Sequence, residues 1–101
     1  MELRHLKYFL AVAEELSYSR AARRLNVAQP ALSRAVKQLE DSLGVAVLER
    51  TRHTVKLTPA GAVLFRNAGL LLEQVEELTR RLQRIAEGEE RETWWQRAVD
   101  Q

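Results

Sequence analysis

A group of polar residues near the middle of the chain has the spacing of one helix face. It comprises Gln29, Pro30, Ser33, Arg34, Lys37 and Gln38. An Arg side chain can donate two hydrogen bonds to guanine, and a Gln amide suits adenine, so such a face is typical of a helix that reads base edges in the DNA major groove. The solvated side of any amphipathic helix can show the same composition. The neighbouring elements must therefore decide between the two interpretations.

The segment before this face favours DNA binding, because it has the pattern of a helix-turn-helix motif. The Ala21–Ala22 pair is small enough to let a second helix cross closely. Asn26 tolerates the left-handed backbone that a sharp turn needs. Pro30 suits the first turn of a helix, which makes Gln29 the expected N-cap. We therefore predict a helix-turn-helix at about residues 18–37.

Apolar spacing predicts a core of three helices around this motif. The second motif helix should run to Leu43, stop at Gly44 and bury a stripe made of Leu32, Val36, Leu39 and Leu43. The N-terminal helix should run from Leu3 to Leu16 and bury Leu3, Leu6, Phe9, Leu10, Ala13 and Leu16. Ser17 and Ser19 supply capping oxygens for the next helix. Tyr18 should pack at the edge of the core, in preference to a phosphate contact through its hydroxyl.

The pattern after Gly44 changes to alternation, which is typical of strands. Val45 and Val47 should point one way and Ala46 and Leu48 the other, and a second short strand follows at 55–57. Two strands around a basic tip predict a β-hairpin wing, although the loop lacks an Asn-Gly turn signal. Four residues of the hairpin could reach phosphates or the minor groove: Arg50, Arg52, His53 and Lys56. The alternative for His53 is a solvated loop residue.

Thr58-Pro59 should open a long helix over residues 59–87. Its apolar residues repeat as a heptad seam, which favours pairing with another helix: Leu64, Ala68, Leu71, Val75, Leu78, Leu82 and Ile85. Gly69 permits a close approach or is simply tolerated. Gly88 should end the helix before a tail at 88–101, in which Trp94 and Trp95 either anchor another chain or belong to a flexible end.

Composition agrees with a small DNA-binding domain. The 101 residues suffice for one modest core plus an extension, there is no Cys, and the net charge of +2 divides into +5 over residues 1–66 and −3 over residues 67–101. No signal peptide or spanning segment is apparent, so we expect a cytoplasmic protein with no membrane contact. His5 and His53 stand apart and no catalytic constellation accompanies them, so we expect neither an enzyme nor a metal or cofactor site.

The chain resembles the N-terminal DNA-binding domain of LysR-type transcriptional regulators from residue 1 to about residue 87. The resemblance is carried by AA-RL-V-QPALSR--KQLE--LG and by LTPAG. It implies a mainly α fold, in which a winged helix-turn-helix domain at 1–58 is followed by a dimerisation helix at 59–87. The positions that touch bases in that family match Gln29, Pro30, Ser33 and Arg34, and the wing positions of the minor groove match Arg52 and His53. The expected phosphate contacts are Arg4, Ser19, Arg20, Lys37, Arg50 and Thr51.

The resemblance also implies how the molecule works. We expect a homodimer with antiparallel linker helices that binds double-stranded DNA at an imperfect inverted repeat and is associated with the nucleoid when bound. Its recognition helices should enter successive major grooves, about 34 to 36 Å apart. Family members usually continue into an effector-binding domain, so no small-molecule effector site is expected in these residues. The competing hypothesis is a protein-interaction module, in which the heptad helix and the Trp pair recruit another regulator into heterodimers.

Overall fold

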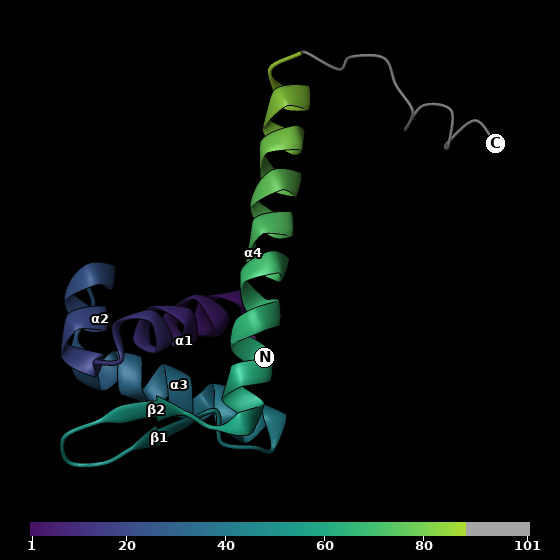
Figure 1. Ribbon diagram of the computed structural model, residues 1–101. Coiled ribbons are helices and arrows are strands. Elements are labelled where there is room, and N and C mark those ends of the chain that lie inside the picture. Colours follow the sequence, from purple (N-terminus) through teal and green to yellow (C-terminus); the bar gives the residue numbers. More distant parts are fainter. Residues whose placement is uncertain (89–101) are drawn as a thin grey trace.

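The computed structural model describes residues 1–88, as three packed helices, a hairpin and one long helix. The elements are α1 (Leu3–Glu15), α2 (Tyr18–Leu25), α3 (Gln29–Leu43), β1 (Leu48–Arg50), β2 (Val55–Leu57) and α4 (Pro59–Ala86). In Figure 1 the hairpin projects beside α3, and α4 rises away from the compact head formed by the other elements. This is the mainly α architecture that the sequence predicts. The Trp94–Trp95 pair lies outside the described residues.

The core forms where α1 packs against α2, α3 and α4. Phe9, Val12, Leu32 and Leu39 are completely buried there, and Leu6 is 2% exposed. Most of this core agrees with the predicted apolar stripes, because these residues recur once per helical turn.

Two residues at the ends of α1 do not follow the prediction. Leu3 is 46% exposed and Leu16 is 50% exposed. Helix α1 ends at Glu15, and Leu16 follows in a left-handed conformation with a φ of 51°, its N–H bonded to the Val12 carbonyl. Leu16 is therefore the C-cap of α1, and the turn directs its side chain outward. The predicted extension of the helix to Leu16 was wrong by this one residue.

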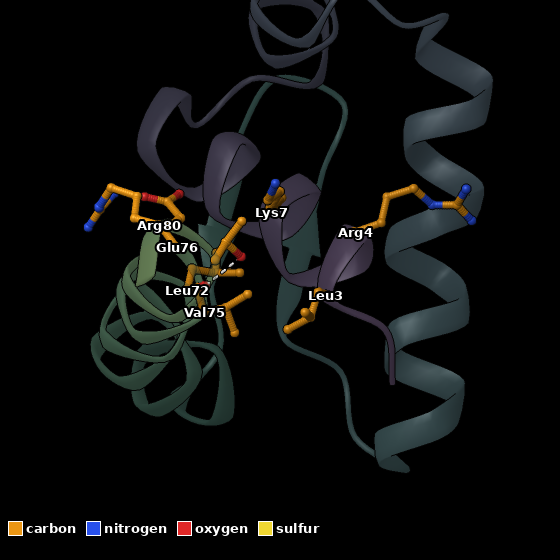
Figure 2. Close-up of a pocket in the computed structure, with 8 residues that line it drawn as sticks. Leu3, Arg4, Lys7, Leu72, Val75, Glu76 and Arg80 are labelled. Carbon is orange, nitrogen blue, oxygen red and sulfur yellow. Dashed lines mark hydrogen bonds between the residues drawn. The ribbon is translucent and has the colours of Figure 1, made fainter. Parts of the chain in front are cut away.

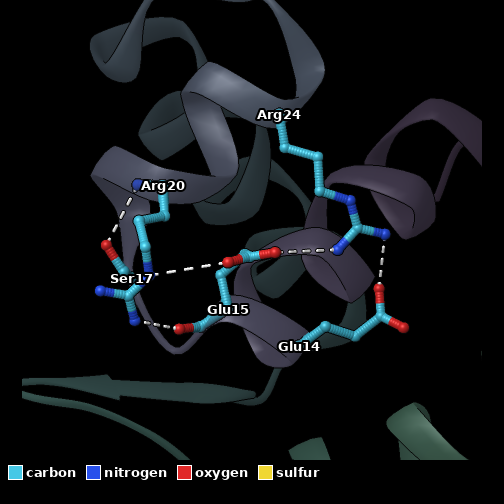
Figure 3. Close-up of polar contacts among 5 residues, drawn as sticks. All are labelled: Glu14, Glu15, Ser17, Arg20 and Arg24. Atoms are coloured by element: carbon cyan, nitrogen blue, oxygen red, sulfur yellow. Dashed lines mark hydrogen bonds and ion pairs between the residues drawn. The ribbon is translucent and has the colours of Figure 1, made fainter.

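The junction between α1 and α2 is held by a cap and by ion pairs (Figure 3). The Ser17 hydroxyl accepts a hydrogen bond from the Arg20 N–H, which confirms Ser17 as the N-cap of α2. The Arg24 guanidinium donates to Glu14 at 2.7 Å and to Glu15 at 3.3 Å. These contacts orient α2 across the end of α1.

The turn between α2 and α3 has the predicted left-handed residue. Asn26 has a φ of 57°, and its N–H bonds the Ala22 and Arg23 carbonyls. The N-cap of α3, however, is Ala28, and the predicted cap Gln29 is the first residue of the helix. The Ala28 side chain has no oxygen that could accept a hydrogen bond. A side-chain cap is less needed here because Pro30, in the first turn, has no N–H group that requires a partner.

Helix α3 ends as predicted, at Gly44 with a φ of 72°. Leu32, Val36 and Leu39 are buried, as the stripe requires. Leu43 is 38% exposed, so the last position of the predicted stripe was wrong. Leu43 is the last residue of the helix, directly before the Gly44 C-cap.

The wing begins later than the alternation pattern suggests. Val45 is 46% exposed, whereas Val47 and Leu48 are both buried although they are adjacent. The predicted alternation over 45–48 is therefore wrong, and the strand starts at Leu48. The cause is the Glu40 carboxylate, whose Oε2 accepts hydrogen bonds from the backbone N–H groups of Val47 and Leu48 at 2.8 and 3.3 Å.

The hairpin itself is antiparallel, and Arg50 pairs with Val55. Two threonines close its turn where an Asn-Gly signal is lacking. The Thr51 N–H donates to the Thr54 carbonyl at 2.9 Å, and the two hydroxyl oxygens lie 2.6 Å apart. The wing predicted from the sequence is thus present, closed by side chains.

Helix α4 begins at the predicted cap, where the Thr58 hydroxyl accepts the Gly61 N–H at 2.9 Å. Ala68 and Leu72 are buried in the head and Phe65 packs against its core. The predicted seam was therefore wrong at Ala68, which has no exposed surface left for a partner. Leu64 also packs against the core, so the domain covers the first seam positions itself.

The far end of α4 agrees with the prediction, since the helix ends at Ala86 and Gly88 follows with a φ of 92°. Within residues 1–88, no helix is both long and apolar enough to cross a bilayer.

Candidate nucleic-acid interface

The start of α3 presents the polar face that the sequence singles out. Pro30, Arg34, Lys37 and Gln38 are exposed, while Gln29 and Ser33 are partly buried against neighbouring elements. The opposite face of α3 is fixed in the core, so the direction of these side chains is set by the packing of the helix. They stand on a rigid element, which is what a base-reading surface requires.

Ser19 orients the amide of Gln29. The Ser19 hydroxyl donates to Gln29 Oε1 at 3.2 Å, across the turn from α2 to α3. The Gln29 Nε2 remains available to donate, and Oε1 retains a second lone pair. Adenine recognition uses one donor and one acceptor of a Gln amide, so this contact leaves Gln29 competent for it.

Arg50 of the wing contacts α2 and α3. Its guanidinium carbon lies 4.4 Å from the centre of the Tyr18 ring, and its Nη1 is 3.4 Å from Ser33 Oγ. Tyr18 is 8% exposed, which confirms its place at the edge of the core. Burial and the nearby Glu40 raise the pKa of Tyr18 and Arg50 opposes them, so the phenol is neutral near pH 7.

A polar hollow of about 370 Å³ joins these elements. It lies between the start of α2, Gln29 and the wing loop, and its polar lining is Ser17, Tyr18, Ser19, Arg20, Gln29, Arg50, Thr51, Arg52, His53 and Thr54. Most of the predicted phosphate and wing residues are therefore brought to one side of the molecule. Arg52 and His53 are exposed at the tip of the hairpin, as a groove contact requires.

Arg4 lies apart from that hollow, in a second one with α3. In Figure 2 the Arg4 side chain extends away from α4. It lines a hollow of about 260 Å³ together with Tyr8, Arg34 and Gln38. Arg4, a predicted phosphate contact, therefore lies beside Arg34 and not in the hollow that the wing lines.

Several of the predicted phosphate-binding cations have carboxylate partners in the free chain. Lys37 lies 3.3 Å from Asp41, Arg20 lies 3.6 Å from Glu15, and Arg4 lies 3.7 Å from Glu2. Exposed pairs of this kind contribute about 0 to 1 kcal/mol, so a phosphate can replace the carboxylate at little cost.

The exposed part of the seam lies on the outer half of α4. Leu71, Val75, Leu78 and Leu82 are between 36% and 56% exposed. Val75 also lines an apolar hollow of about 500 Å³ between α4 and the start of α1, where Leu3 and Leu72 contribute (Figure 2). The Glu77 carboxylate beside this seam accepts hydrogen bonds from Arg80, which lower the pKa of Glu77. A heptad seam that remains exposed is typical of a helix that pairs with another helix.

Some residues that shape the interface were not predicted from the sequence. Glu40 fixes the start of the wing, and Tyr8 lines the hollow beside Arg34. Gly61 is the site of a close approach, because a Cβ there would overlap the Val47 carbonyl oxygen. At Gly69 a Cβ would meet nothing in this chain, so the head makes no close approach there. In the sequence, a carboxylate in the last turn of a helix before a strand is only a weak sign that it will bind the strand's backbone. The close approach at Gly61 leaves no recognisable pattern in the sequence.

The two histidines and the carboxylates of residues 1–88 do not gather into a set of possible metal ligands. This part of the chain contains no group of three or more His, Asp or Glu side chains that could hold a metal. His5 is buried with its Nε2 lacking a hydrogen-bond partner, and it lies 3.9 Å from the Glu2 carboxylate. His53 is exposed on the wing, so the two histidines do not meet.

Comparison with known proteins assigns the fold to a family. A family model for bacterial regulatory helix-turn-helix proteins of the lysR family matches residues 3–62. The chain belongs to this lysR family. It is 50% identical over 90 residues to the regulator AlsR of Bacillus subtilis and 48% identical over 86 residues to BenM of Acinetobacter baylyi. These matches cover 89% and 85% of this chain but only 30% and 28% of the relatives, so the chain spans about a third of their length.

Solved structures of family members agree with the fold. The BenM DNA-binding domain in complex with catB site 1 DNA is 48% identical and superposes with a TM-score of 0.82 over 87% of this chain and 98% of that one. The CbnR DNA-binding domain in complex with DNA is 42% identical, with a TM-score of 0.81 over 85% of this chain and 99% of that one. The lysR family members that the chain resembles are transcriptional regulators and not enzymes.

Proposed function

We propose that the chain binds double-stranded DNA in a sequence-specific manner as the DNA-reading part of a LysR-type transcription regulator. The observation that carries this proposal is the exposed polar face at the start of α3, which is held by contacts from α2 and the wing. Its likeness to domains solved together with DNA supports the same function. On this proposal the chain acts in the cytoplasm and is associated with the nucleoid when it is bound to DNA.

We propose a division of labour within the interface. Gln29, Pro30, Ser33 and Arg34 contact base edges, and Arg52 and His53 enter the minor groove. Phosphates are bound by Arg4, Ser19, Arg20, Lys37, Arg50 and Thr51. Their grouping around α3 and the wing supports this assignment, and all of them except the partly buried Gln29 and Ser33 are exposed.

We further propose that two copies pair through α4 and read an imperfect inverted repeat. The outer seam supports this, because four large apolar side chains on one helix face otherwise remain in water. Pairing must be confined to Leu71 and the seam positions after it, because Ala68 is used by the head.

The experiment that tests the proposed function is selection of bound duplexes from a random pool, followed by gel shifts at two salt concentrations. We expect an enriched inverted repeat whose affinity falls steeply with salt, as it does when cations neutralise phosphates. Enrichment of no sequence, together with capture of the chain by another regulator through α4, would instead favour the protein-interaction module.

A further inference from the structure

Arg50 is the wing residue that contacts both other parts of the interface. It belongs to β1, it stacks on Tyr18 of α2, and it donates to Ser33 of α3. A planar guanidinium can stack and donate at the same time, which the point charge of a Lys cannot do. Because Tyr18 is buried, the platform under Arg50 is fixed.

Other wing cations lack such contacts. Lys56 lies opposite Glu49 on the same hairpin, and no partner of its ammonium group is found among residues 1–88. Arg52 at the tip is exposed and is likewise without an ion pair in that part of the chain. These two side chains are therefore not held in place by the protein. Arg50 uses its planar face and one N–H in contacts with the protein, and its other N–H groups remain available to a phosphate.

The strand that carries Arg50 is itself tied to α3. Glu40 in the last turns of α3 accepts the N–H groups of Val47 and Leu48, just before and at the start of β1. With Arg50 donating to Ser33 near the start of α3, the wing is joined to both ends of the recognition helix. The position of Arg50 relative to Ser33 therefore does not depend on DNA.

We propose that Arg50 is a positioning residue for base recognition, which directs the Ser33 hydroxyl and holds the wing in register with α3. The inference rests on the proposed function and deepens it. A hydroxyl has one hydrogen to donate and two lone pairs to accept with. Since Arg50 occupies a lone pair, the hydrogen of Ser33 points away from the wing. Ser33 then presents its hydrogen and one remaining lone pair to the DNA, and donation of that hydrogen favours a base with an acceptor in the major groove, such as N7 of a purine.

The test compares variants of the whole chain on two duplexes, the one selected from a random pool and a scrambled version of it, at two salt concentrations. The variants are Arg50→Ala, Arg50→Lys, Ser33→Ala, the double variant of Ser33→Ala with Arg50→Ala, and Lys56→Ala as the matched wing control. Tyr18→Phe keeps the ring under Arg50 and serves as a second control. Far-UV circular dichroism checks folding, and Arg50→Lys carries the test if Arg50→Ala is unfolded.

We expect Arg50→Ala and Arg50→Lys to reduce the preference for the selected duplex on the order of fivefold to tenfold, the size seen for coupled neighbours. Because Arg50 acts through Ser33, the two losses should not add. The double variant should prefer the selected duplex at least as strongly as whichever single variant, Ser33→Ala or Arg50→Ala, has the smaller preference. Repeated selection with Arg50→Lys should relax the same base position as Ser33→Ala. Lys56→Ala should weaken binding to both duplexes equally, and Tyr18→Phe should keep the preference.

Two outcomes would overturn the inference, and they are distinguishable. If Arg50→Lys keeps the preference while Arg50→Ala weakens both duplexes equally, Arg50 is a phosphate contact only and the proposed function stands. If the wild-type chain prefers no duplex, the proposed function fails and the inference fails with it.

Discussion

Arg34 and Lys37 lie on the same face of α3 but in different electrostatic surroundings. Lys37 is paired with Asp41 at 3.3 Å, whereas Arg34 has no ion-pair partner among residues 1–88. A guanidinium that points outward near the start of a recognition helix can bind guanine through two hydrogen bonds. The ammonium of Lys37 is a point charge farther along the helix, and a phosphate can replace its exposed carboxylate partner at little cost.

Replacing these two residues should therefore affect DNA binding in different ways. We expect Arg34→Ala to cost about 1 to 3 kcal/mol on the selected duplex and to relax specificity at one base, whereas Lys37→Ala should weaken all duplexes and lower the salt slope by about one. Titrations of both variants on selected and scrambled DNA at several salt concentrations measure the difference. Equal losses on both duplexes for both variants would contradict the assignment.

At the scale of elements, α4 packs so closely against the segment before the wing that a side chain would not fit at Gly61. A Cβ at Gly61 would overlap the Val47 carbonyl and lie 3.3 Å from the Leu57 side chain. The first turn of α4 thus rests directly on the segment that leads into the wing. Gly69, two turns later, faces open space in this chain.

This contrast gives a stability prediction. We expect Gly61→Ala to lower the free energy of unfolding by about 1 to 3 kcal/mol, because the backbone must shift to relieve the overlap. Gly69→Ala is the matched control and should raise it by up to about 1 kcal/mol through helix propensity. Urea denaturation measures both. A Gly61→Ala variant as stable as the wild type would show that the close approach is not constrained.

Local rules account for what the sequence predicted correctly. The turn at Asn26, the stop at Gly44 and the cap at Thr58 depend on a residue and its near neighbours, and all three are found. Periodicity shows which side of a helix is apolar, but it does not show how far the covering element extends. For that reason Leu43 was predicted to be buried and Ala68 to be free.

The site was predictable in its residues but not in its connections. The polar face of α3 could be recognised from spacing alone. The contacts of Arg50 with Tyr18 and Ser33 join positions 32 and 17 residues apart in the chain, and no periodic pattern records them. Only the packed wing brings these side chains together.

At the scale of the whole molecule, the outer seam should decide the oligomeric state. Replacing Leu71, Val75 and Leu78 with Gln should give monomers, because these side chains contribute exposed apolar surface that pairing would bury. Sedimentation equilibrium reads the result. Leu70→Gln is the control, since Leu70 is 61% exposed on α4 but lies off the seam. A triple variant that remains dimeric would place the interface elsewhere.

A paired molecule should also be sensitive to the spacing of its half-sites. Inserting about five base pairs, half of a helical turn, between the halves of the selected repeat should reduce the affinity to that of a single half-site. The second half-site then faces the opposite side of the duplex. Gel shifts with the native, lengthened and single half-site duplexes measure this, and an unchanged affinity for the lengthened duplex would indicate that monomers bind independently.

Helix α4 is continuous from Pro59 to Ala86, about 42 Å of uninterrupted helix, and its first turns are part of the head while its last turns carry the seam. No loop separates the turns of α4 that pack in the head from the turns that carry the exposed seam. A rotation of one α4 against its partner would consequently be passed on to the head as by a lever arm, with a displacement that grows along the helix. Whatever alters the crossing angle of the two helices would thereby select which operator spacings are read.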